Sequence, residues 1–391
     1  MVPKGWKRVP IKDVCESIID CVNKTAPVVD YETPFKMIRT TNVRNGRVNT
    51  EDVRYVTEDT YLQWVRRGKP QVGDIIFTRE APVGEAGVLQ DAEGIFLGQR
   101  TMMYRADTCL SDNYFLFYSL SSPFCQKQIE DFSNGGTVAH MRVPDCGEIL
   151  INLPPFLEQK KIAQILSTWD KAISVTEKLL ANSQQQKKAL MQQLLTGKKR
   201  LLDENGVRFS GEWRNSTLSM FCNIAKGKAL SASDLEVGDF PVIAGGKSSP
   251  YSHSDYTHEN VVTVSASGAY AGYISYHNYK IWASDCSVVS AKADNLIDYF
   301  YQLLLSLQDK IYSLQSGGAQ PHIYPKDLNS IPLWVPCVKE QQKIVTVLSA
   351  ADAEISTLEK KLACLRDEKK ALMQQLLTGK RRVKVDEAVA E

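Results

Sequence analysis

The chain has 391 residues and a mass of 43.8 kDa, with 43% hydrophobic and 24% charged residues. Because folded domains are typically about 100–200 residues long, this length predicts at least two domains of an ordinary soluble protein. The sequence has no run of about 18 consecutive apolar residues that could cross a membrane, and its first residues lack the apolar core of a signal peptide. We therefore expect a cytoplasmic protein with no membrane partner.

Cysteine content and charge exclude further classes. The nine cysteines include no C-x-x-C pair, which argues against a disulfide framework and against a paired zinc site. A net charge of +2 argues against a strongly basic coat for nucleic acid. Positive charge is concentrated in residues 151–202, which hold nine Lys and Arg against three Asp and Glu.

Residues 1–152 are predicted to form a first globular domain of mixed helix and strand. The β-branched run at 73–78 predicts a strand, and residues 114–131 predict a helix. Polar loops separate the expected strands, and their Arg and Asn side chains are typical of groups that contact base edges and phosphates. The candidate DNA-binding residues of this domain are Arg39, Thr41, Asn42, Arg44, Asn45, Arg47, Lys69, Arg79 and Arg100.

Residues 153–200 are predicted to form one long helix that begins after Pro154-Pro155 and ends at Gly197, a common left-handed cap. Apolar and small residues recur in a four-three spacing over more than four heptads, as in the seam of a coiled coil. Its apolar seam residues are Ile162, Leu166, Trp169, Ile173, Leu180 and Leu194, and Thr176, Ser183 and Lys187 are polar seam positions.

Residues 201–334 are predicted to form a second globular domain of the same kind. A strand is expected at 260–265 and a helix at 296–313. Glycine-rich polar loops again lie between the expected strands. The candidate DNA-binding residues here are Lys247, Ser248, Tyr251, Ser265, Ser267 and Tyr270.

Residues 335–391 are predicted to form a second long helix and a tail. The apolar seam residues are Ile344, Leu348, Ile355, Leu358, Leu362 and Leu376, and Gly379 marks the end. A helix of about 40 residues is about 60 Å long, too long to be buried inside one domain, so we expect the two helices to pair with each other. A rigid spacer and an ordinary dimerisation coiled coil both remain open.

An internal repeat links the two halves. The segment from Lys187 to Lys198 recurs unchanged from Lys369 to Lys380, at an offset of 182 residues. The same offset aligns Gly135-Gly136 with Gly317-Gly318, His140 with His322, Asp145 with Asp327, Glu158-Gln159 with Glu340-Gln341, and Asp170 with Asp352. The chain is therefore interpreted as a duplication. The C-terminal part of each half has stayed alike, which suggests a shared task, while the N-terminal part has diverged and is free to read something different.

The sequence contains no complete catalytic motif. Asp145, Glu158 and Lys160 formally match a nuclease pattern of two metal-binding carboxylates and a lysine, but the second copy lacks the lysine. No phosphate-binding loop, H-E-x-x-H or G-x-S-x-G occurs. His253 and His258 lack a second pair of metal ligands. The sequence thus predicts no catalytic, metal or cofactor site in this chain.

The chain closely resembles the specificity subunit of type I restriction-modification systems, over essentially its whole length. The most specific elements are L-P-P-x-x-E-Q-K-x-I-x-x-x-L at 153–166 and V-P-x-x-x-E-Q-x-K-I-x-x-x-L at 335–348, each followed by a helix ending Q-Q-L-L-T-G-K. The resemblance implies an α/β (α+β) fold with a pseudo-twofold repeat and two antiparallel spacer helices. Residues 6–150 would read one half of a split DNA target, residues 213–332 the other half, and the helices would set the gap.

The resemblance also implies the partners. These would be double-stranded DNA, two methyltransferase subunits that use S-adenosylmethionine, and restriction subunits that use ATP and Mg²⁺, while this chain supplies no catalysis and binds no cofactor. Two other classes stay open from the residues alone. A nuclease or methyltransferase in its own right would be active when purified alone, and an architectural coiled-coil adaptor would bind proteins without preferring any DNA sequence.

Overall fold

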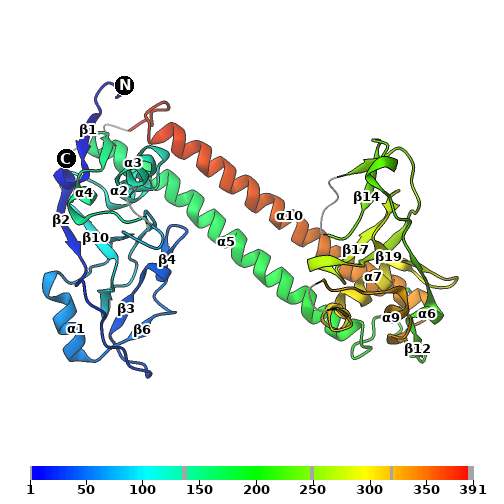
Figure 1. The fold of residues 1–391 in the computed structure, drawn as a ribbon. Helices are drawn as coiled ribbons and strands as arrows, with labels where there is room; N and C mark the ends of the chain where they lie inside the picture. Colours follow the sequence, from blue (N-terminus) through cyan, green and yellow to red (C-terminus); the bar gives the residue numbers. More distant parts are fainter. Residues whose placement is uncertain (1, 134–138, 247–250, 318–319, 386–391) are drawn as a thin grey trace. The chain divides into compact units, whose positions relative to one another are not determined.

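The computed structural model describes residues 2–133, 139–246, 251–317 and 320–385, so the candidate residues Lys247 and Ser248 lie outside the described part. The chain folds into two compact units, which Figure 1 shows by sequence colour. Unit 1 contains residues 1–176 and 361–391, and unit 2 contains residues 177–360. Each unit thus holds part of both long helices. The expected division at residues 152, 200 and 334 stays a prediction, because packing groups each globular segment with pieces of both helices.

Unit 1 is built on a four-stranded antiparallel sheet with the strand order β2, β10, β7, β8. The strands are β2 (Cys15–Asp20), β7 (Ile75–Thr78), β8 (Ala86–Val88) and β10 (Thr101–Ala106), and β7 confirms the strand expected at 73–78. Both faces of the sheet are covered. Ile75 and Phe77 face a core shared with the following helices, while Ile76 faces a second core under a smaller sheet.

Short strands complete unit 1. In the smaller sheet, β3 (Lys36–Ile38) lies between β6 (Arg54–Tyr55) and β9 (Ile95–Leu97). Two further pairs are separate: β4 (Val43–Arg44) with β5 (Arg47–Val48), and β1 (Lys7–Pro10) with β11 (Leu150–Leu153). The short helices are η1 (Ile11–Val14), η2 (Thr40–Asn42), α1 (Glu58–Trp64), η3 (Val65–Arg67) and α4 (Val143–Gly147).

Unit 2 repeats this architecture although its sequence has diverged. Its four-stranded antiparallel sheet has the order β13 (Cys222–Lys226), β19 (Cys286–Ala291), β16 (Val261–Ser265), β17 (Ile274–His277), and β16 confirms the strand expected at 260–265. The smaller sheet has the order β15 (Ser252–His253), β14 (Phe240–Ile243), β18 (Trp282–Ala283), and β12 (Arg214–Thr217) pairs with β20 (Pro332–Val335). Short helices are α6 (Leu218–Phe221), η4 (Ala232–Asp234), η5 (Gly268–Tyr270) and α9 (Pro325–Asn329).

The prediction of a single helix near 114–131 was wrong. Two helices form there: α2 (Asn113–Leu120) and α3 (Pro123–Ser133). Pro123 has no N–H to continue the first helix, and Ser122 Oγ accepts a hydrogen bond from the Cys125 N–H at 3.3 Å, which caps the second. The helix expected near 296–313 is likewise divided, into α7 (Ile297–Ser306) and α8 (Gln308–Tyr312), with Leu307 outside helical geometry.

The two long helices, α5 (Phe156–Leu194) and α10 (Val338–Leu376), have 39 residues each. The residues expected in the seam are all buried or half-buried: Ile162, Leu166, Trp169, Ile173, Leu180, Leu194, Ile344, Leu348, Ile355, Leu358, Leu362 and Leu376. In unit 1, Lys369 of α10 donates to Asp170 of α5 at 2.5 Å, and in unit 2, Lys187 of α5 donates to Asp352 of α10 at 2.5 Å. These contacts make the helices antiparallel partners within each unit.

The ends of both long helices follow the glycine prediction. Gly197 has a φ of +70° and its N–H donates to the Leu194 carbonyl, and Gly379 has a φ of +68° and donates to Leu376. Glycine adopts this left-handed conformation without the clash of a Cβ, so it ends the helix at a defined residue.

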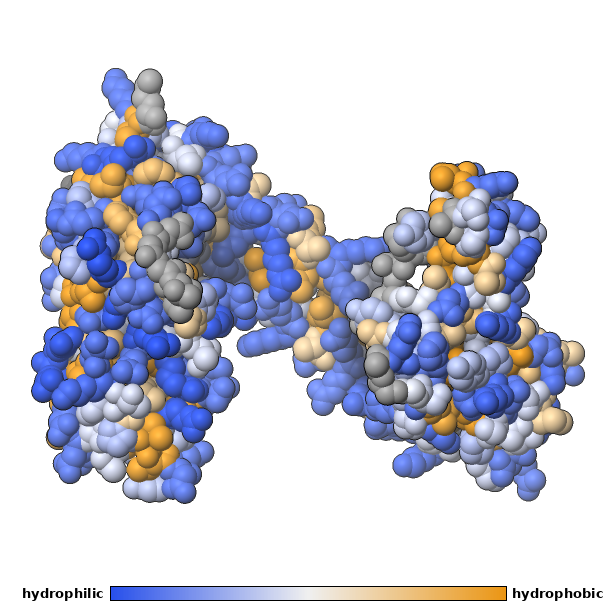
Figure 2. Space-filling view, in the orientation of Figure 1, coloured by the Kyte–Doolittle hydropathy of each residue, from blue (hydrophilic) through white to orange (hydrophobic). Residues whose placement is uncertain are grey.

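The surface is mainly hydrophilic. On the face that Figure 2 shows, hydrophobic groups occur as small patches, in keeping with cores that lie inside the two units. Among the described residues, no helix is long and apolar enough to cross a membrane.

Candidate nucleic-acid interface

In unit 1, a polar loop that the sequence singled out lies against a second loop that it did not. The first follows β3 and contains Arg44 and Asn45, and the second follows β7. Arg44 Nη2 donates to the Ala81 carbonyl at 3.3 Å, and the Asn45 N–H donates to Glu85 Oε2 at 3.0 Å. Asn45 and Gly46 both have positive φ, as a tight turn between β4 and β5 requires. These contacts join the β4–β5 turn, which carries the two candidates, to the loop between β7 and β8.

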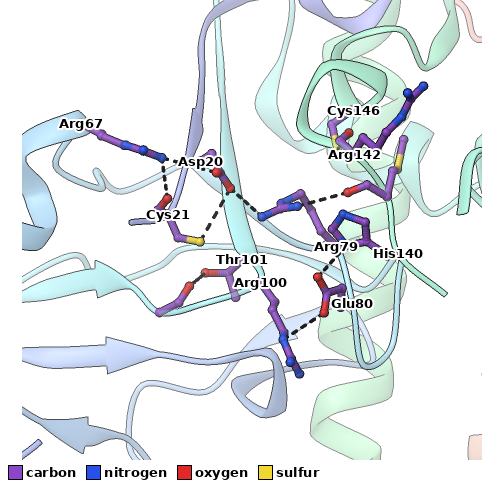
Figure 3. Close-up of polar contacts among 12 residues, drawn as sticks. Asp20, Cys21, Arg67, Arg79, Glu80, Arg100, Thr101, His140, Arg142 and Cys146 are labelled. Atoms are coloured by element: carbon purple, nitrogen blue, oxygen red, sulfur yellow. Dashed lines mark hydrogen bonds and ion pairs between the residues drawn. The ribbon is translucent and has the colours of Figure 1, made fainter. Parts of the chain in front are cut away.

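Next to these loops, three polar side chains meet in what we call the unit 1 junction: Glu80, Arg100 and His140 (Figure 3). Glu80 Oε2 accepts from Arg100 Nε at 2.9 Å, and Glu80 Oε1 lies 2.5 Å from His140 Nδ1. The Arg100 and His140 side chains are 56% and 44% exposed. The junction therefore presents a guanidinium and an imidazole on the surface, both held by one carboxylate.

The backbone of Arg100 is held in an uncommon conformation. Its φ is +69°, a left-handed value that non-glycine residues adopt at a cost of about 1–3 kcal/mol and that clusters at functional sites. The Arg79 N–H donates to the Arg100 carbonyl at 2.8 Å, which fixes this turn before β10. The fold thus keeps a long cationic side chain where glycine would be less strained.

Arg79, predicted to contact DNA, is a buried group. Its side chain is 7% exposed, it pairs with Asp20 at 3.0 Å, and its Nη1 donates to the Met141 carbonyl at 3.2 Å (Figure 3). Arg67 Nη1 donates to the neighbouring Cys21 carbonyl at 2.7 Å. Alternation along the extended chain explains the burial, because Arg79 continues the face of Phe77 while Glu80 points to the other side.

The other candidates of unit 1 are divided between surface and interior. Thr41, Asn45, Arg47 and Lys69 are exposed, and Arg39 and Arg44 are half-buried. Asn42 is buried, where its Oδ1 accepts from the Arg39 N–H at 3.0 Å and its Nδ2 donates to the Asp52 carbonyl at 2.5 Å. Asn42 therefore stabilises the loop that carries its exposed neighbours. Among the described residues, no hydrogen bond or ion pair links the Lys69 side chain to the junction.

In unit 2, Ser265, Ser267 and Tyr270 lie at or just after the end of β16, whereas Tyr251 directly precedes β15. Tyr251 and Tyr270 are exposed, Ser267 is half-buried, and Ser265 is buried within the strand. Ser267 Oγ donates to Asp285 Oδ2, and the backbone of Ser267 forms an isolated antiparallel bridge with His322. We call Ser267, Asp285 and His322 the unit 2 junction.

Sequence reasoning missed four junction residues: Glu80, His140, Asp285 and His322. A signal was present for the two histidines, because they align in the internal repeat at the offset of 182 residues. Glu80 and Asp285 carried none, since acidic residues are repelled by phosphate and only the fold shows what they hold.

The repeated E-Q motif has a structural role in each unit. In unit 1, Glu158 is 3% exposed and accepts from Trp6 Nε1 at 3.1 Å and from Arg382 Nε and Nη2 at 2.7 and 2.8 Å. Hydrogen bonding to this carboxylate raises the pKa of Arg382. We call Trp6, Glu158 and Arg382 the unit 1 clamp.

The unit 2 clamp has the same three residue types, at Arg200, Trp213 and Glu340. Glu340 is 1% exposed and accepts from Trp213 Nε1 at 3.3 Å and from Arg200 Nε and Nη2 at 2.5 and 2.7 Å. The basic runs after each helix thus supply the arginine that neutralises a buried carboxylate, in addition to lying at the negative end of a helix dipole.

The residues considered for metal or nuclease chemistry have other partners. Asp145 accepts two hydrogen bonds from Arg142, at 2.6 and 3.0 Å, and Glu158 belongs to the clamp. His253 is buried, with its ring 4.2 Å from that of Trp282 and its Nε2 3.3 Å from the Asp234 carbonyl. Within the described ranges, no group of three or more His, Cys, Asp or Glu side chains could hold a metal ion.

Comparison with known proteins gives one family. A model described as the type I restriction modification DNA specificity domain matches residues 3–182 and again residues 210–365. The two matches contain the two junctions and the buried carboxylates of the two clamps.

Individual relatives agree along the whole chain. A putative type I restriction enzyme MjaX specificity subunit from Methanocaldococcus jannaschii is 25% identical, over 98% of this chain and 95% of that protein. The crystal structure of a type I restriction-modification S subunit from M. genitalium has the same fold, with a TM-score of 0.70 and 19% identity over 96% of this chain and 99% of that chain. A second solved structure, from work on complex assembly of a type I system, has a TM-score of 0.55 and 18% identity over 97% of this chain and 100% of that chain.

Proposed function

Since the chain belongs to the type I restriction-modification DNA specificity family, we propose that it directs a methyltransferase complex to a DNA target made of two separated half-sites. Unit 1 reads one half-site through the segment 6–150, and unit 2 reads the other through the segment 213–332. The chain supplies recognition of the DNA sequence and no catalysis.

One observation carries the proposal: two units share their sheet order while their surface loops differ. The order β2, β10, β7, β8 is matched by β13, β19, β16, β17, and the smaller sheets match as well. The loops after β3 and β7 carry arginines and an Asn-Gly turn, whereas the loop after β16 carries serines and Tyr270. A constant scaffold with different polar groups suits a protein that reads two different short sequences.

Partner subunits complete the activity in this proposal. Two methyltransferase subunits use S-adenosylmethionine to methylate adenine N6, and restriction subunits use ATP and Mg²⁺. Such partners also explain how a chain with a net charge of +2 binds DNA, because they can neutralise phosphates that this chain does not reach.

The long helices are proposed to set the gap between the half-sites. Support comes from their length of 39 residues each and from the polar seam pairs Asp170–Lys369 and Lys187–Asp352. Polar residues in an apolar seam favour one register, because a shifted register would bury each charge without its partner.

The decisive experiment maps N6-methyladenine across the genome of cells that carry this chain with its neighbouring methyltransferase, and again after deletion of the chain. We expect a two-part motif with a fixed gap that disappears on deletion. Identical maps in the two strains would count against the specificity role and favour an architectural adaptor.

An exchange of segments tests the assignment of half-sites. Replacing residues 6–150 with the corresponding segment of another specificity subunit should change one half of the methylated motif and preserve the other. The reciprocal exchange of residues 213–332 is the matched control and should change the opposite half. A change of both halves by one exchange would contradict the modular reading.

A further inference from the structure

The two junctions are built on the same backbone frame. In unit 1, the Arg79 N–H donates to the Arg100 carbonyl at 2.8 Å, and the Arg79 carbonyl accepts from the Met141 N–H at 3.1 Å. The chain leaving β7 is thereby joined on one side to the residue before β10 and on the other to the segment that carries His140.

Unit 2 repeats each of these bonds. The Ala266 N–H donates to the Asp285 carbonyl at 3.2 Å, and the Ala266 carbonyl accepts from the Ile323 N–H at 2.9 Å. Isolated bridges join Glu80 to His140 and Ser267 to His322 in the same way.

Strand register confirms the equivalence independently. Thr78 lies opposite Thr101 where β7 pairs with β10, and Ser265 lies opposite Cys286 where β16 pairs with β19. Two residues past the end of the first strand stand Glu80 and Ser267, and directly before the second strand stand Arg100 and Asp285. Each position of one junction therefore has a counterpart in the other.

The histidine is constant and its two neighbours change. His140 and His322 occupy the same place in the repeat, whereas the pair Glu80 and Arg100 is replaced by Ser267 and Asp285. The exchange converts an exposed cation into an anion at one position of an unchanged frame. Selection for stability alone would not explain a charge reversal at a site that both folds build alike.

Arg100 and Asp285 each keep polar atoms without a partner in the described part of the chain, and these atoms are of the kinds that bind base edges. Glu80 engages Arg100 through Nε, and among the residues that the structure describes no hydrogen bond engages the two terminal nitrogens of Arg100. In unit 2, Ser267 engages Asp285 through Oδ2, and no described residue bonds its Oδ1. Arginine pairs with O6 and N7 of guanine, and an acidic side chain accepts from N4 of cytosine.

We propose that the junctions are the base-reading positions of the two half-sites, with Arg100 recognising a guanine and Asp285 the amino group of a cytosine. The assignment rests on the proposed function and specifies which side chain of each unit determines one base. Glu80 and Ser267 are positioning residues, because each holds the reading side chain in one orientation.

The test uses the assembled methyltransferase complex containing this chain and duplexes randomised in both half-sites, with N6-adenine methylation read by sequencing. Arg100→Ala should reduce discrimination for guanine at one position of the first half-site by about 10- to 100-fold. Asp285→Asn should do the same for cytosine at one position of the second half-site. Each variant should leave the other half-site unchanged.

Further variants separate reading from folding. Arg100→Lys keeps the charge without the bidentate fork, so it should lose base discrimination while methylation of the original target persists. Glu80→Ala should weaken the same base preference, and Glu80→Asp should restore part of it. The controls Lys127→Ala and Asp309→Asn change exposed charges of the same sign away from the junctions and should alter no base preference.

The outcomes distinguish the two levels of the argument. A wild-type complex that methylates no two-part motif overturns the proposed function. A wild-type two-part motif that Arg100→Ala and Asp285→Asn leave intact at every position overturns the junction proposal and keeps the function. Equal loss of methylation on all sequences with Arg100→Ala would make Arg100 a phosphate contact and likewise overturn it.

Discussion

His277 is a buried histidine that links the stability of unit 2 to pH. It is 4% exposed, with Nε2 2.9 Å from Thr263 Oγ1 and Nδ1 3.2 Å from the Tyr279 hydroxyl. Burial lowers the pKa of His277 from 6.5 to about 4, because the charged imidazolium loses its hydration. The folded chain therefore keeps this ring neutral over a range in which the unfolded chain takes up a proton.

The sign of the pH dependence follows. Stability is fully present above pH 6.5 and falls as pH decreases toward about 4, by up to about 3 kcal/mol for this one group. His277→Gln, which has no titrating ring, should flatten the decline of the unfolding temperature of unit 2 between pH 7 and pH 5. His322→Gln is the control and should leave the decline in place. An equally steep decline in His277→Gln would assign the effect to other groups.

Thiol reactivity separates the buried from the exposed cysteines. All nine are free, and burial raises the pKa of Cys15, Cys125, Cys146, Cys222 and Cys286 to about 12. A disulfide reagent at pH 8 should react rapidly with the exposed Cys109 and Cys337 and more slowly with exposed Cys364, whose pKa is raised by the Glu368 carboxylate. The buried thiols should react only after denaturant is added, and rapid modification of all nine in the native chain would contradict this.

Among the elements, the two clamps make a matched pair of tests. In each clamp, removing the arginine leaves the buried glutamate with a single side-chain donor, the tryptophan Nε1–H. Arg200→Ala should destabilise unit 2 by about 3 kcal/mol, since its side chain is 21% exposed. Arg382→Ala should destabilise unit 1 by only about 1–2 kcal/mol, because its side chain is 45% exposed and better screened.

Hydrogen exchange read by mass spectrometry locates each effect. Arg200→Ala should accelerate exchange at the start of α10, and Arg382→Ala at the start of α5. The neighbouring variants Lys199→Ala and Arg381→Ala remove exposed charges outside the clamps and should change neither. Acceleration in the wrong unit, or none, would contradict the clamp assignment.

Elements that depend on a local sequence pattern could be predicted, whereas those that depend on contacts between distant residues could not. The seam of α5 and α10 was predictable because the heptad pattern is local and repeats for 39 residues in each helix. The break at Pro123 was missed because apolar residues resume directly after it, at Phe124 and Cys125, so the two helices were interpreted as one. The matching of β10 to β19 could not be predicted, since pairing between distant strands leaves no local signal once the sequences have diverged.

The candidate site shows the same limit. Loop composition included Arg44, Arg100 and Ser267, whose side chains are exposed or half-buried, and their role in binding DNA stays a prediction. It did not show which side chains point inward, so Asn42, Arg79 and Ser265 were included although they are buried. Side-chain direction at a strand end depends on a register that only the folded sheet supplies.

At the scale of the whole molecule, unit 1 depends on residues from both ends of the chain. Leu376 and Leu377 are buried in the same core as Ile162 and Leu166, and Arg382 completes the clamp with Trp6. A chain ending at residue 360 should therefore keep unit 2 protected from hydrogen exchange and lose protection in residues 156–176. The full chain is the reference, and equal protection of residues 156–176 in both would contradict this dependence.

The discontinuous make-up of unit 1 also has a consequence for synthesis on the ribosome. Unit 2 is one continuous segment, residues 177–360, whereas unit 1 combines residues 1–176 with residues 361–391. Domains generally fold as units while the chain emerges from its N-terminal end. The unit that is translated first can bury Ile162 and Leu166 only when residues near 376 have left the ribosome. Unit 2 is thus completed before unit 1, and the nascent chain carries an unfinished apolar surface on α5 until residues near 376 have emerged.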